Sequence, residues 1–197
     1  FEDGFESGNF SAWTGTYAFG GAPSVQSTIK HHGTYAQLSS LVNANDGKGA
    51  YKDFACTYAT LYFRIYAYVT ATPASGQYIQ LGGICDLGDA NDLAMIAIYN
   101  NAGTLNWRLN YKTDSTTGTS DSATPSISIN TWYYVEVRFN GHASAGDVKA
   151  WIVADGGSIA EGSPTINVTG LANDNVLAQE VYASTWSTAA LTVSVYE

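Results

Sequence analysis

The run from Thr60 to Thr70 constrains the fold most, because its side chains alternate in character with a period of two. Its odd positions, from Leu61 to Val69, are all apolar, whereas its even positions carry Tyr62, Arg64, Tyr66 and Tyr68. Successive side chains of a β-strand point to opposite faces. The run therefore predicts a strand with one face in a hydrophobic core and one aromatic, cationic face turned outward.

The same alternation recurs along the chain, and signals for helices are nearly absent. Apolar residues again occupy every second position in the runs Thr104 to Lys112, Thr131 to Asn140 and Val148 to Ala154. Clusters of Gly, Asn, Asp and Ser separate these runs, as is typical of sandwiches and barrels. We therefore predict an all-β fold, a two-sheet antiparallel jelly-roll β-sandwich with ten or more strands.

Three further expectations follow from this pattern. Trp107 shares its face with leucines, which predicts a core position for its ring rather than a ligand contact. The polar segment Thr113 to Pro125 is predicted to be a long loop. No Pro-rich or charge-rich linker divides the chain, so residues 1–197 are predicted to form a single domain.

The charge balance bears on the partners that the protein can bind. Charged residues make up only 13% of the sequence and the formal net charge is −9. Nucleic acids and anionic membranes need clustered Lys and Arg, so nucleic acid is not predicted as a partner. No apolar run reaches the ~18 residues of a membrane helix, so no membrane insertion is predicted. Neutral glycans and divalent cations remain compatible with this composition.

Composition also predicts a secreted protein, extracellular or at the cell surface. The chain has 14 Tyr and 5 Trp, abundant Thr and few Lys, and two glycosylation sequons begin at Asn9 and Asn167. The only cysteines are Cys56 and Cys85. In an oxidising compartment they could form one disulfide, which the chain-entropy model values at ~3 kcal/mol. The alternative is two buried thiols that act as small hydrophobic groups.

Three local motifs carry a resemblance to a known family. The opening stretch Phe1 to Trp13 reads as a first strand anchored by Phe5 and Trp13, and it resembles the first strand of many carbohydrate-binding modules. The segment Lys30-His31-His32-Gly33-Thr34-Tyr35-Ala36 is similar to their "His-Ser-Gly-Ser-Tyr-Ala" segment. Trp132-Tyr133-Tyr134-Val135-Glu136-Val137, followed by Val148 to Gly156, resembles a hairpin of laminin-G-like domains.

Together these motifs resemble the concanavalin A-like lectin/glucanase superfamily over nearly the whole chain. The resemblance implies a jelly roll with a concave sheet facing the ligand, and in many members a structural Ca²⁺ on the convex side. Carried over to this sequence, the implied calcium ligands are Glu6 (or Glu2 or Asp3), Gly33 and Glu197. The family usually has an Asp-Asp pair and a further apolar stretch where this sequence has Glu197. Oxygen ligands of this kind are what Ca²⁺ requires.

Catalytic constellations are not evident in the sequence. Retaining glucanases need two carboxyl groups about 5–5.5 Å apart, and no Glu-x-Asp-x-(x)-Glu run supplies them. Glu136 stands alone on its strand, and Asp86, Asp89 and Asp92 lie in a predicted solvated turn. Lyases of the superfamily use Tyr and His with Arg and Gln. Because all three histidines lie in predicted turns or loops, we expect the histidine of such a set to be missing.

A binding function needs only flat aromatic rings for sugar faces and Arg, Asn or Gln for hydroxyl groups. The outward positions of the predicted strands supply a candidate carbohydrate-binding set: Tyr62, Arg64, Tyr66, Arg108, Asn110, Tyr134, Arg138 and Trp151. The same residue types are enriched at protein interfaces, so this face could instead pack against another subunit.

The leading hypothesis is therefore a non-catalytic, lectin-like carbohydrate-binding domain with a glycan or polysaccharide as partner. The second is a structural subunit of an extracellular assembly (a filament, sheath, surface layer or virion) whose copies associate through β-strand contacts. A polysaccharide lyase or hydrolase is the third.

Overall fold

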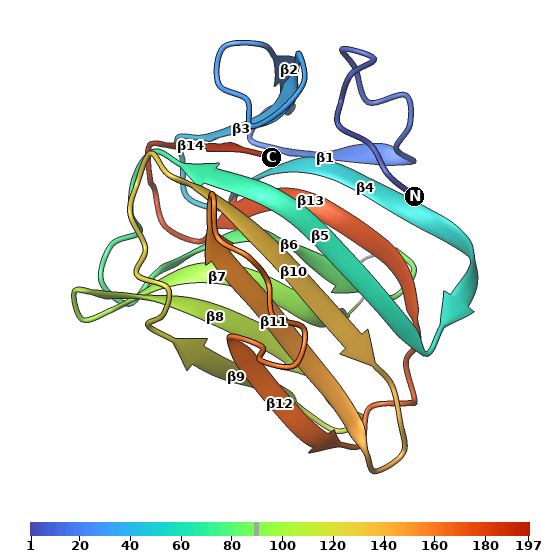
Figure 1. Ribbon diagram of the computed structural model, residues 1–197. Coiled ribbons are helices and arrows are strands. Elements are labelled where there is room, and N and C mark those ends of the chain that lie inside the picture. Colours follow the sequence, from blue (N-terminus) through green and yellow to red (C-terminus); the bar gives the residue numbers. More distant parts are fainter. Residues whose placement is uncertain (89–90) are drawn as a thin grey trace.

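The protein is an antiparallel β-sandwich of two seven-stranded sheets, seen in the computed structural model of Figure 1, which describes residues 1–88 and 91–197. In spatial order, sheet A contains β1 (Gly15–Phe19), β4 (Asp46–Tyr58), β13 (Ala178–Ser187), β6 (Tyr78–Cys85), β7 (Asp92–Asn101), β8 (Thr104–Lys112) and β9 (Thr117–Ser122). Sheet B contains β12 (Ile166–Leu171), β11 (Gly146–Ala154), β10 (Trp132–Asn140), β5 (Thr60–Val69), β14 (Val193–Tyr196), β3 (Ala36–Leu41) and β2 (Ser24–Gln26). Both the all-β class and the two-sheet jelly-roll architecture are confirmed. Within the described residues, no helix is long and apolar enough to cross a membrane.

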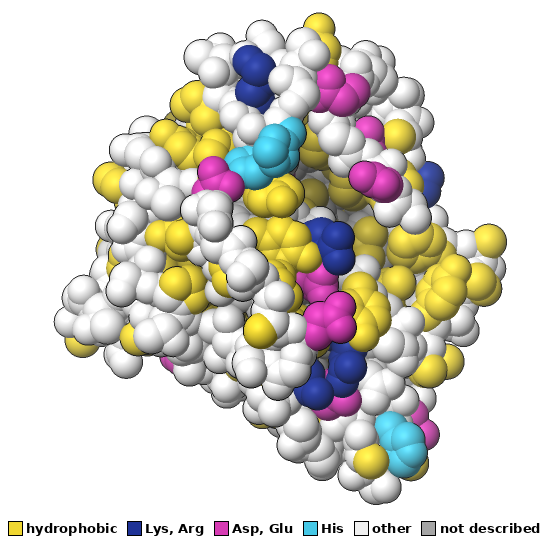
Figure 2. Space-filling model, in the orientation of Figure 1, with side chains coloured by type: hydrophobic (Ala, Val, Ile, Leu, Met, Phe, Trp, Pro, Cys, Tyr) yellow, Lys and Arg dark blue, Asp and Glu magenta, His cyan; other side chains and the backbone are white. Residues whose placement is uncertain are grey.

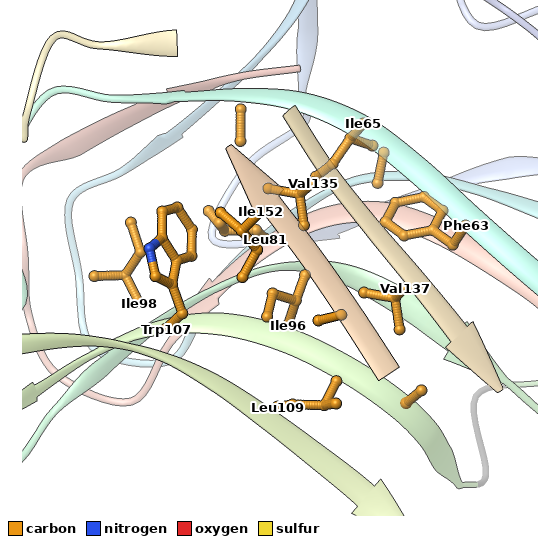
Figure 3. Close-up of a cluster of buried hydrophobic side chains, with 14 of the residues drawn as sticks. Phe63, Ile65, Leu81, Ile96, Ile98, Trp107, Leu109, Val135, Val137 and Ile152 are labelled. Carbon is orange, nitrogen blue, oxygen red and sulfur yellow. The ribbon is translucent and has the colours of Figure 1, made fainter. Parts of the chain in front are cut away.

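The core lies between the two sheets and is built from the apolar positions of the alternating strands (Figure 3). Phe63 and Ile65 of β5 point into it beside Val135 and Val137 of β10. Trp107 is fully buried, and its indole Nε1 donates a 2.8 Å hydrogen bond to the carbonyl oxygen of Pro125. The prediction that Trp107 belongs to the core is confirmed.

The opening stretch does not form the predicted strand. Residues 1–14 fold as turns over sheet B, and the first strand begins only at Gly15. Gly8 donates its backbone N–H to the Phe5 carbonyl at 2.8 Å, and Phe5 adopts a left-handed φ of 61°. The glycines and Asn of this stretch favour turns over extended backbone. The anchoring role holds nonetheless, because the rings of Phe5 and Trp13 stack at 5.6 Å.

The segment Thr113 to Pro125, predicted to be a loop, contains the edge strand β9. It pairs with β8 along its whole length, from Trp107 opposite Ser122 to Lys112 opposite Thr117. Its side chains are all small or polar because neither face is deeply buried. An edge strand of this kind carries no apolar alternation, which is the signal that sequence reasoning uses.

Candidate functional site

A cleft of about 1020 Å³ opens on the outer face of sheet B, beneath the turns of residues 1–14 and the turn at residues 30–35. Figure 2 shows this face, with acidic and basic side chains on the floor of the hollow and hydrophobic side chains around them. We call it the sheet-B cleft. Its outer part is lined by Tyr62, Arg64, Tyr66, Trp132, Glu136, Arg138 and Trp151. Its inner part is lined by Phe5, Trp13, Phe54, Phe63, Ile65 and Val181.

Strand register places the charged residues of the cleft side by side. In the β5–β10 ladder Arg64 stands opposite Glu136, and Tyr66 stands opposite Tyr134. The Arg64 guanidinium donates to Glu136 Oε2 from Nε at 2.9 Å and from a terminal nitrogen at 2.7 Å. The Tyr134 hydroxyl donates to the same oxygen at 2.7 Å. The Arg64 side chain nevertheless stays 64% exposed, so it can reach a ligand.

These contacts favour a charged Arg64 and a protonated, neutral Tyr134. Hydrogen bonding to Glu136 raises the pKa of Arg64, which stays cationic. Burial, together with the hydrogen bond to Glu136, raises the pKa of Tyr134 far above its ordinary value. Tyr134 is therefore a hydrogen-bond donor in this network and is unsuited to act as a base near neutral pH.

A second ion pair continues the floor of the cleft. Arg138 of β10 donates from Nε to Asp147 Oδ1 at 3.0 Å, and a terminal guanidinium nitrogen contacts the same oxygen. Asn140 donates to the other carboxylate oxygen of Asp147 at 3.2 Å. Because each arginine of the cleft is paired with a carboxylate, the floor presents hydrogen-bond donors without a strong net positive charge.

His31 lies against this face, contrary to the expectation that all histidines would lie elsewhere. Its ring stacks on Tyr66 with centroids 3.9 Å apart and an interplanar angle of 16°. Its Nε2 lies 2.9 Å from Asp155 Oδ1, in the turn that follows β11. Hydrogen bonding to His31 lowers the pKa of Asp155. The turn at residues 30–35 folds back over sheet B, a long-range contact that sequence periodicity does not report.

The predicted carbohydrate-binding set is divided between the two sheets. Six of its eight residues lie on the outer face of sheet B: Tyr62, Arg64, Tyr66, Tyr134, Arg138 and Trp151. Arg108 and Asn110 lie on β8 of sheet A, so they face away from the cleft and this part of the prediction is wrong. Alternation shows which residues point outward but does not show which sheet a strand joins. Arg108 is engaged there by Asp121, with two contacts of 2.8 Å.

The two tryptophans in the outer part of the cleft, Trp132 and Trp151, differ in exposure. Trp151 is only 6% exposed, and its Nε1 donates to the Glu161 carbonyl at 3.1 Å, so it forms a wall of the cleft. Trp132 was not predicted as a site residue, yet it lines the cleft beside His31 and Tyr68. Its even position at the start of β10, in phase with Tyr134 and Glu136, was the signal that could have identified it.

Sheet A carries its own polar cluster, which sequence reasoning missed. Glu180 of β13 accepts a 2.6 Å hydrogen bond from the Tyr17 hydroxyl and a 3.2 Å contact from the Cys85 thiol. The Tyr182 hydroxyl donates to Asp92. Burial raises the pKa of Glu180 to about 7. Glu180 and Tyr182 are each only 1% exposed, so this cluster cannot touch a solute in this conformation.

The acidic turn and the cysteines do not form the sites considered for them. Asp86 binds the backbone N–H and the side chain of Asn91, while Asp89 lies outside the described residues. Cys56 and Cys85 are both free, so of the two alternatives left open for them the disulfide is not formed, and only one of the two thiols is buried. Cys56 is exposed near the end of β4, whereas Cys85 is buried against Glu180 on β6.

Two of the residues implied as calcium ligands lie together. The Glu6 carboxylate accepts the backbone N–H groups of Thr34 and Tyr35 at 3.0–3.2 Å, beside Gly33. These hydrogen bonds lower the pKa of Glu6. Asp3 instead accepts Trp13 Nε1 at 2.6 Å and the Phe5 N–H at 3.1 Å, and Glu2 is exposed.

Glu197, the third implied calcium ligand, makes contacts of a different kind. Its side chain contacts Gln37 and Thr185, and burial raises its pKa to about 8. Among the described residues, no three His, Cys, Asp or Glu side chains gather as metal ligands. The residues thus fit two of the three implied contacts, and calcium stays a prediction.

Comparison with known proteins places the fold in a class. The sequence matches no protein-family model and no curated protein sequence. Solved structures do match. The cellulose-induced protein Cip1 superposes with a TM-score of 0.64 at 15% identity, over 98% of this chain and 92% of that chain. An alginate lyase from Pseudomonas aeruginosa has a TM-score of 0.57 at 9% identity, over 87% of this chain and 82% of that chain.

The globular domain of Trypanosoma cruzi calreticulin also has a TM-score of 0.57, at 8% identity, over 98% of this chain and 84% of that chain. These similarities show a β-sandwich fold shared with Cip1, the alginate lyase and the calreticulin domain, which agrees with the fold that the resemblance implied. At such identities they describe the backbone alone, and the function has to be argued from the site.

Proposed function

We propose that the protein binds glycans in the sheet-B cleft without catalysing a reaction, and that it does so outside the cell or at the cell surface. The observation that carries this proposal is the outer part of the cleft, which is lined by the rings of Tyr62, Tyr66 and Trp132 and by the side chains of Arg64 and Arg138. Concave sites with aromatic walls and a few polar groups are the usual form of ligand sites.

The chemistry of the cleft suits an uncharged, hydroxyl-rich ligand. Aromatic rings offer flat apolar surfaces to the C–H faces of sugar rings, and Arg64 presents N–H donors that Glu136 leaves free. Glu136 and Asp147 neutralise the two arginines. An anionic polysaccharide would therefore gain little Coulomb attraction here. Sugar hydroxyl groups, in contrast, can accept hydrogen bonds from the arginines and donate hydrogen bonds to the carboxylates.

A panel of neutral and acidic polysaccharides in affinity electrophoresis tests the proposal. Tyr66→Ala removes a ring from the cleft and should weaken binding about tenfold or more, as loss of a stacking platform does. Tyr99→Ala is the matched control, because Tyr99 lies beneath Arg108 on the opposite face and should leave binding unchanged. Equal binding by both variants, or no retardation by any polysaccharide, would refute the assignment of the cleft.

A polysaccharide lyase is the second candidate, favoured by the stack of His31 on Tyr66 beside Arg64. A lyase abstracts a proton next to a uronate carboxylate, and that step needs a base and a cation. His31 Nε2 is bound to Asp155, and Nδ1 is buried with no hydrogen-bond partner among the described residues, so neither nitrogen is exposed to solvent as a free base in this conformation. Unsaturated products formed from a uronate polymer, and lost in Tyr66→Phe, would establish lyase activity in place of simple binding.

A further inference from the structure

The segment that joins β11 to β12 crosses the outer face of sheet B in front of β11 (Figure 1). We call these residues, 155–165, the strap. The carbonyl oxygen of Glu161, in the middle of the strap, accepts the hydrogen bond from Trp151 Nε1. Trp151 stands on the outward face of β11, opposite Glu136 of β10, yet it is buried. The strap therefore covers an aromatic ring that β11 presents to the cleft.

Both ends of the strap are anchored to sheet B or to the turn above it. At the start of the strap, Asp155 Oδ1 lies 2.9 Å from His31 Nε2. At its end, Thr165 Oγ1 accepts the backbone N–H of Ile152 at 3.0 Å. These two contacts hold the ends in place, so any movement of the strap is confined to its middle.

The middle of the strap, residues 158–164, is held weakly. The bond from Trp151 to Glu161 is the one hydrogen bond that joins this part to a strand among the described residues. Ile159 is half-buried, whereas the side chains at 158 and from 160 to 163 are exposed, and they are small or polar. A fixed cover over an indole ring would bury more apolar surface against it. A segment with so little buried apolar surface opens at a low cost in free energy.

The strap lines two hollows on the outer face of sheet B. Glu161 lines the sheet-B cleft together with Trp151. The first half of the strap lines a smaller hollow of about 240 Å³, together with Tyr66 and Tyr134. Tyr66 also lines the cleft. Moving the middle of the strap away from β11 would therefore join the two hollows and uncover the ring of Trp151.

We propose that the strap is a lid, and that a polysaccharide displaces it and stacks on the uncovered ring of Trp151. This inference rests on the proposed function and adds how the site opens. The joined groove would cross three adjacent strands, from Tyr66 of β5 over Tyr134 of β10 to β11. It would accommodate several consecutive sugar units, so the ligand is the interior of a polymer and not a single sugar.

The exchange of partners at Trp151 explains why the lid closes without a ligand. In the free protein the closed strap keeps an apolar ring out of water. When the strap lifts, the indole N–H leaves the Glu161 carbonyl and can donate to a sugar hydroxyl instead. The sugar ring then covers the indole in place of the strap, so neither the hydrogen bond nor the burial is lost.

Hydrogen exchange of indole N–H groups tests the lid in the absence of glycan. Trp107 is the internal control, because its Nε1 also donates to a backbone carbonyl oxygen but lies inside the core. Nitrogen-15 NMR follows both signals in the 197-residue chain, and Trp151→Phe identifies the Trp151 signal by its loss. Trp151 should exchange at least about a hundredfold faster than Trp107, through local opening that low urea concentrations do not accelerate.

A pair of isoleucine variants links the opening of the strap to glycan binding. Ile159→Gly removes the half-buried side chain of the strap and should speed the exchange of Trp151 about tenfold. The apparent Kd for a retained polysaccharide should fall by the same factor, because the open strap is the state that binds. Ile129→Gly is the matched control, since Ile129 lies in the loop before β10 and lines neither hollow. It should change neither quantity.

The outcomes separate the lid from the proposed function. Equal exchange of Trp151 and Trp107, with polysaccharide still retained, would overturn the lid and leave glycan binding in place. Faster exchange but weaker binding in Ile159→Gly would overturn the lid as well, because the strap would then be part of the binding surface. If neither the parent nor Ile159→Gly retained any polysaccharide, the proposed function would fail, and the glycan lid with it.

Discussion

The two outer faces of the sandwich carry similar residue types but use them differently. On sheet A, Glu180 and Tyr182 are enclosed, and their polar atoms are bonded to Tyr17, Cys85 and Asp92. On sheet B, the Arg64–Glu136 pair opens into a cleft. Buried polar groups that are fully partnered stabilise one structure, whereas exposed groups with free donors can bind a ligand. The same chemistry therefore contributes to stability on one face and to recognition on the other.

The largest expected effect comes from removing a buried ring on sheet A. Tyr182→Ala should lower the free energy of unfolding by about 3–5 kcal/mol, because it opens a cavity and leaves Asp92 without its donor. Urea unfolding at constant pH measures the loss. Tyr66→Ala on sheet B should cost clearly less, since Tyr66 is only partly buried. A reversed order would show that sheet B, and not sheet A, carries the stabilising cluster.

The next largest effect on stability is expected from breaking one ion pair on each face. Glu136→Leu should lower the free energy of unfolding by about 2 kcal/mol, because the donors of Arg64 and Tyr134 lose a nearly buried acceptor. Asp121→Leu breaks the Arg108 pair, whose carboxylate is more exposed than that of Glu136 (30% against 11%), and should cost about 1 kcal/mol or less. Thermal unfolding of the two variants side by side compares them. Equal shifts would contradict the difference in burial on which the prediction rests.

Stability should depend on pH through Glu180 and Glu197. Their folded pKa values, about 7 and about 8, lie above the ordinary value of 4.5. The folded protein therefore holds protons that the unfolded chain has released, so this stabilisation is complete below pH 4.5 and is lost as the pH rises through 7 to 8. Denaturant unfolding across this range should show a decline, and Glu180→Gln should flatten its lower part. A rising stability over the same range would contradict the burial of these carboxyl groups.

Calcium should give the smallest effect. An ion held by Glu6 and Gly33 would tie the opening turns to the turn at residues 30–35, a contact that Glu6 already makes through two backbone N–H groups. At a free concentration equal to its Kd, such an ion would add only about 0.4 kcal/mol. The unfolding temperature with calcium and with a chelator measures it, and Glu6→Gln should abolish the difference. No difference in the parent protein would remove calcium from the description.

Periodicity predicted the strands whose two faces differ. Thr60–Val69, Trp132–Asn140 and Gly146–Ala154 have the expected inward and outward faces, and the last two form the predicted hairpin. Strands without an apolar alternation escape this kind of prediction: β9 lies in the segment predicted to be a loop, and β4 was not predicted. In β4 glycines replace apolar side chains because Ser184 and Trp186 pack directly against its backbone.

The sequence by itself determined the class of fold and the outward positions of the aromatic and cationic residues, because a period of two is a local property of each strand. Only the tertiary structure decided that Arg108 and Asn110 leave the binding set and that His31 joins Tyr66. These facts depend on which strands pair and how turns fold over a sheet. Contacts between residues far apart in the chain set them, and no local pattern records such contacts.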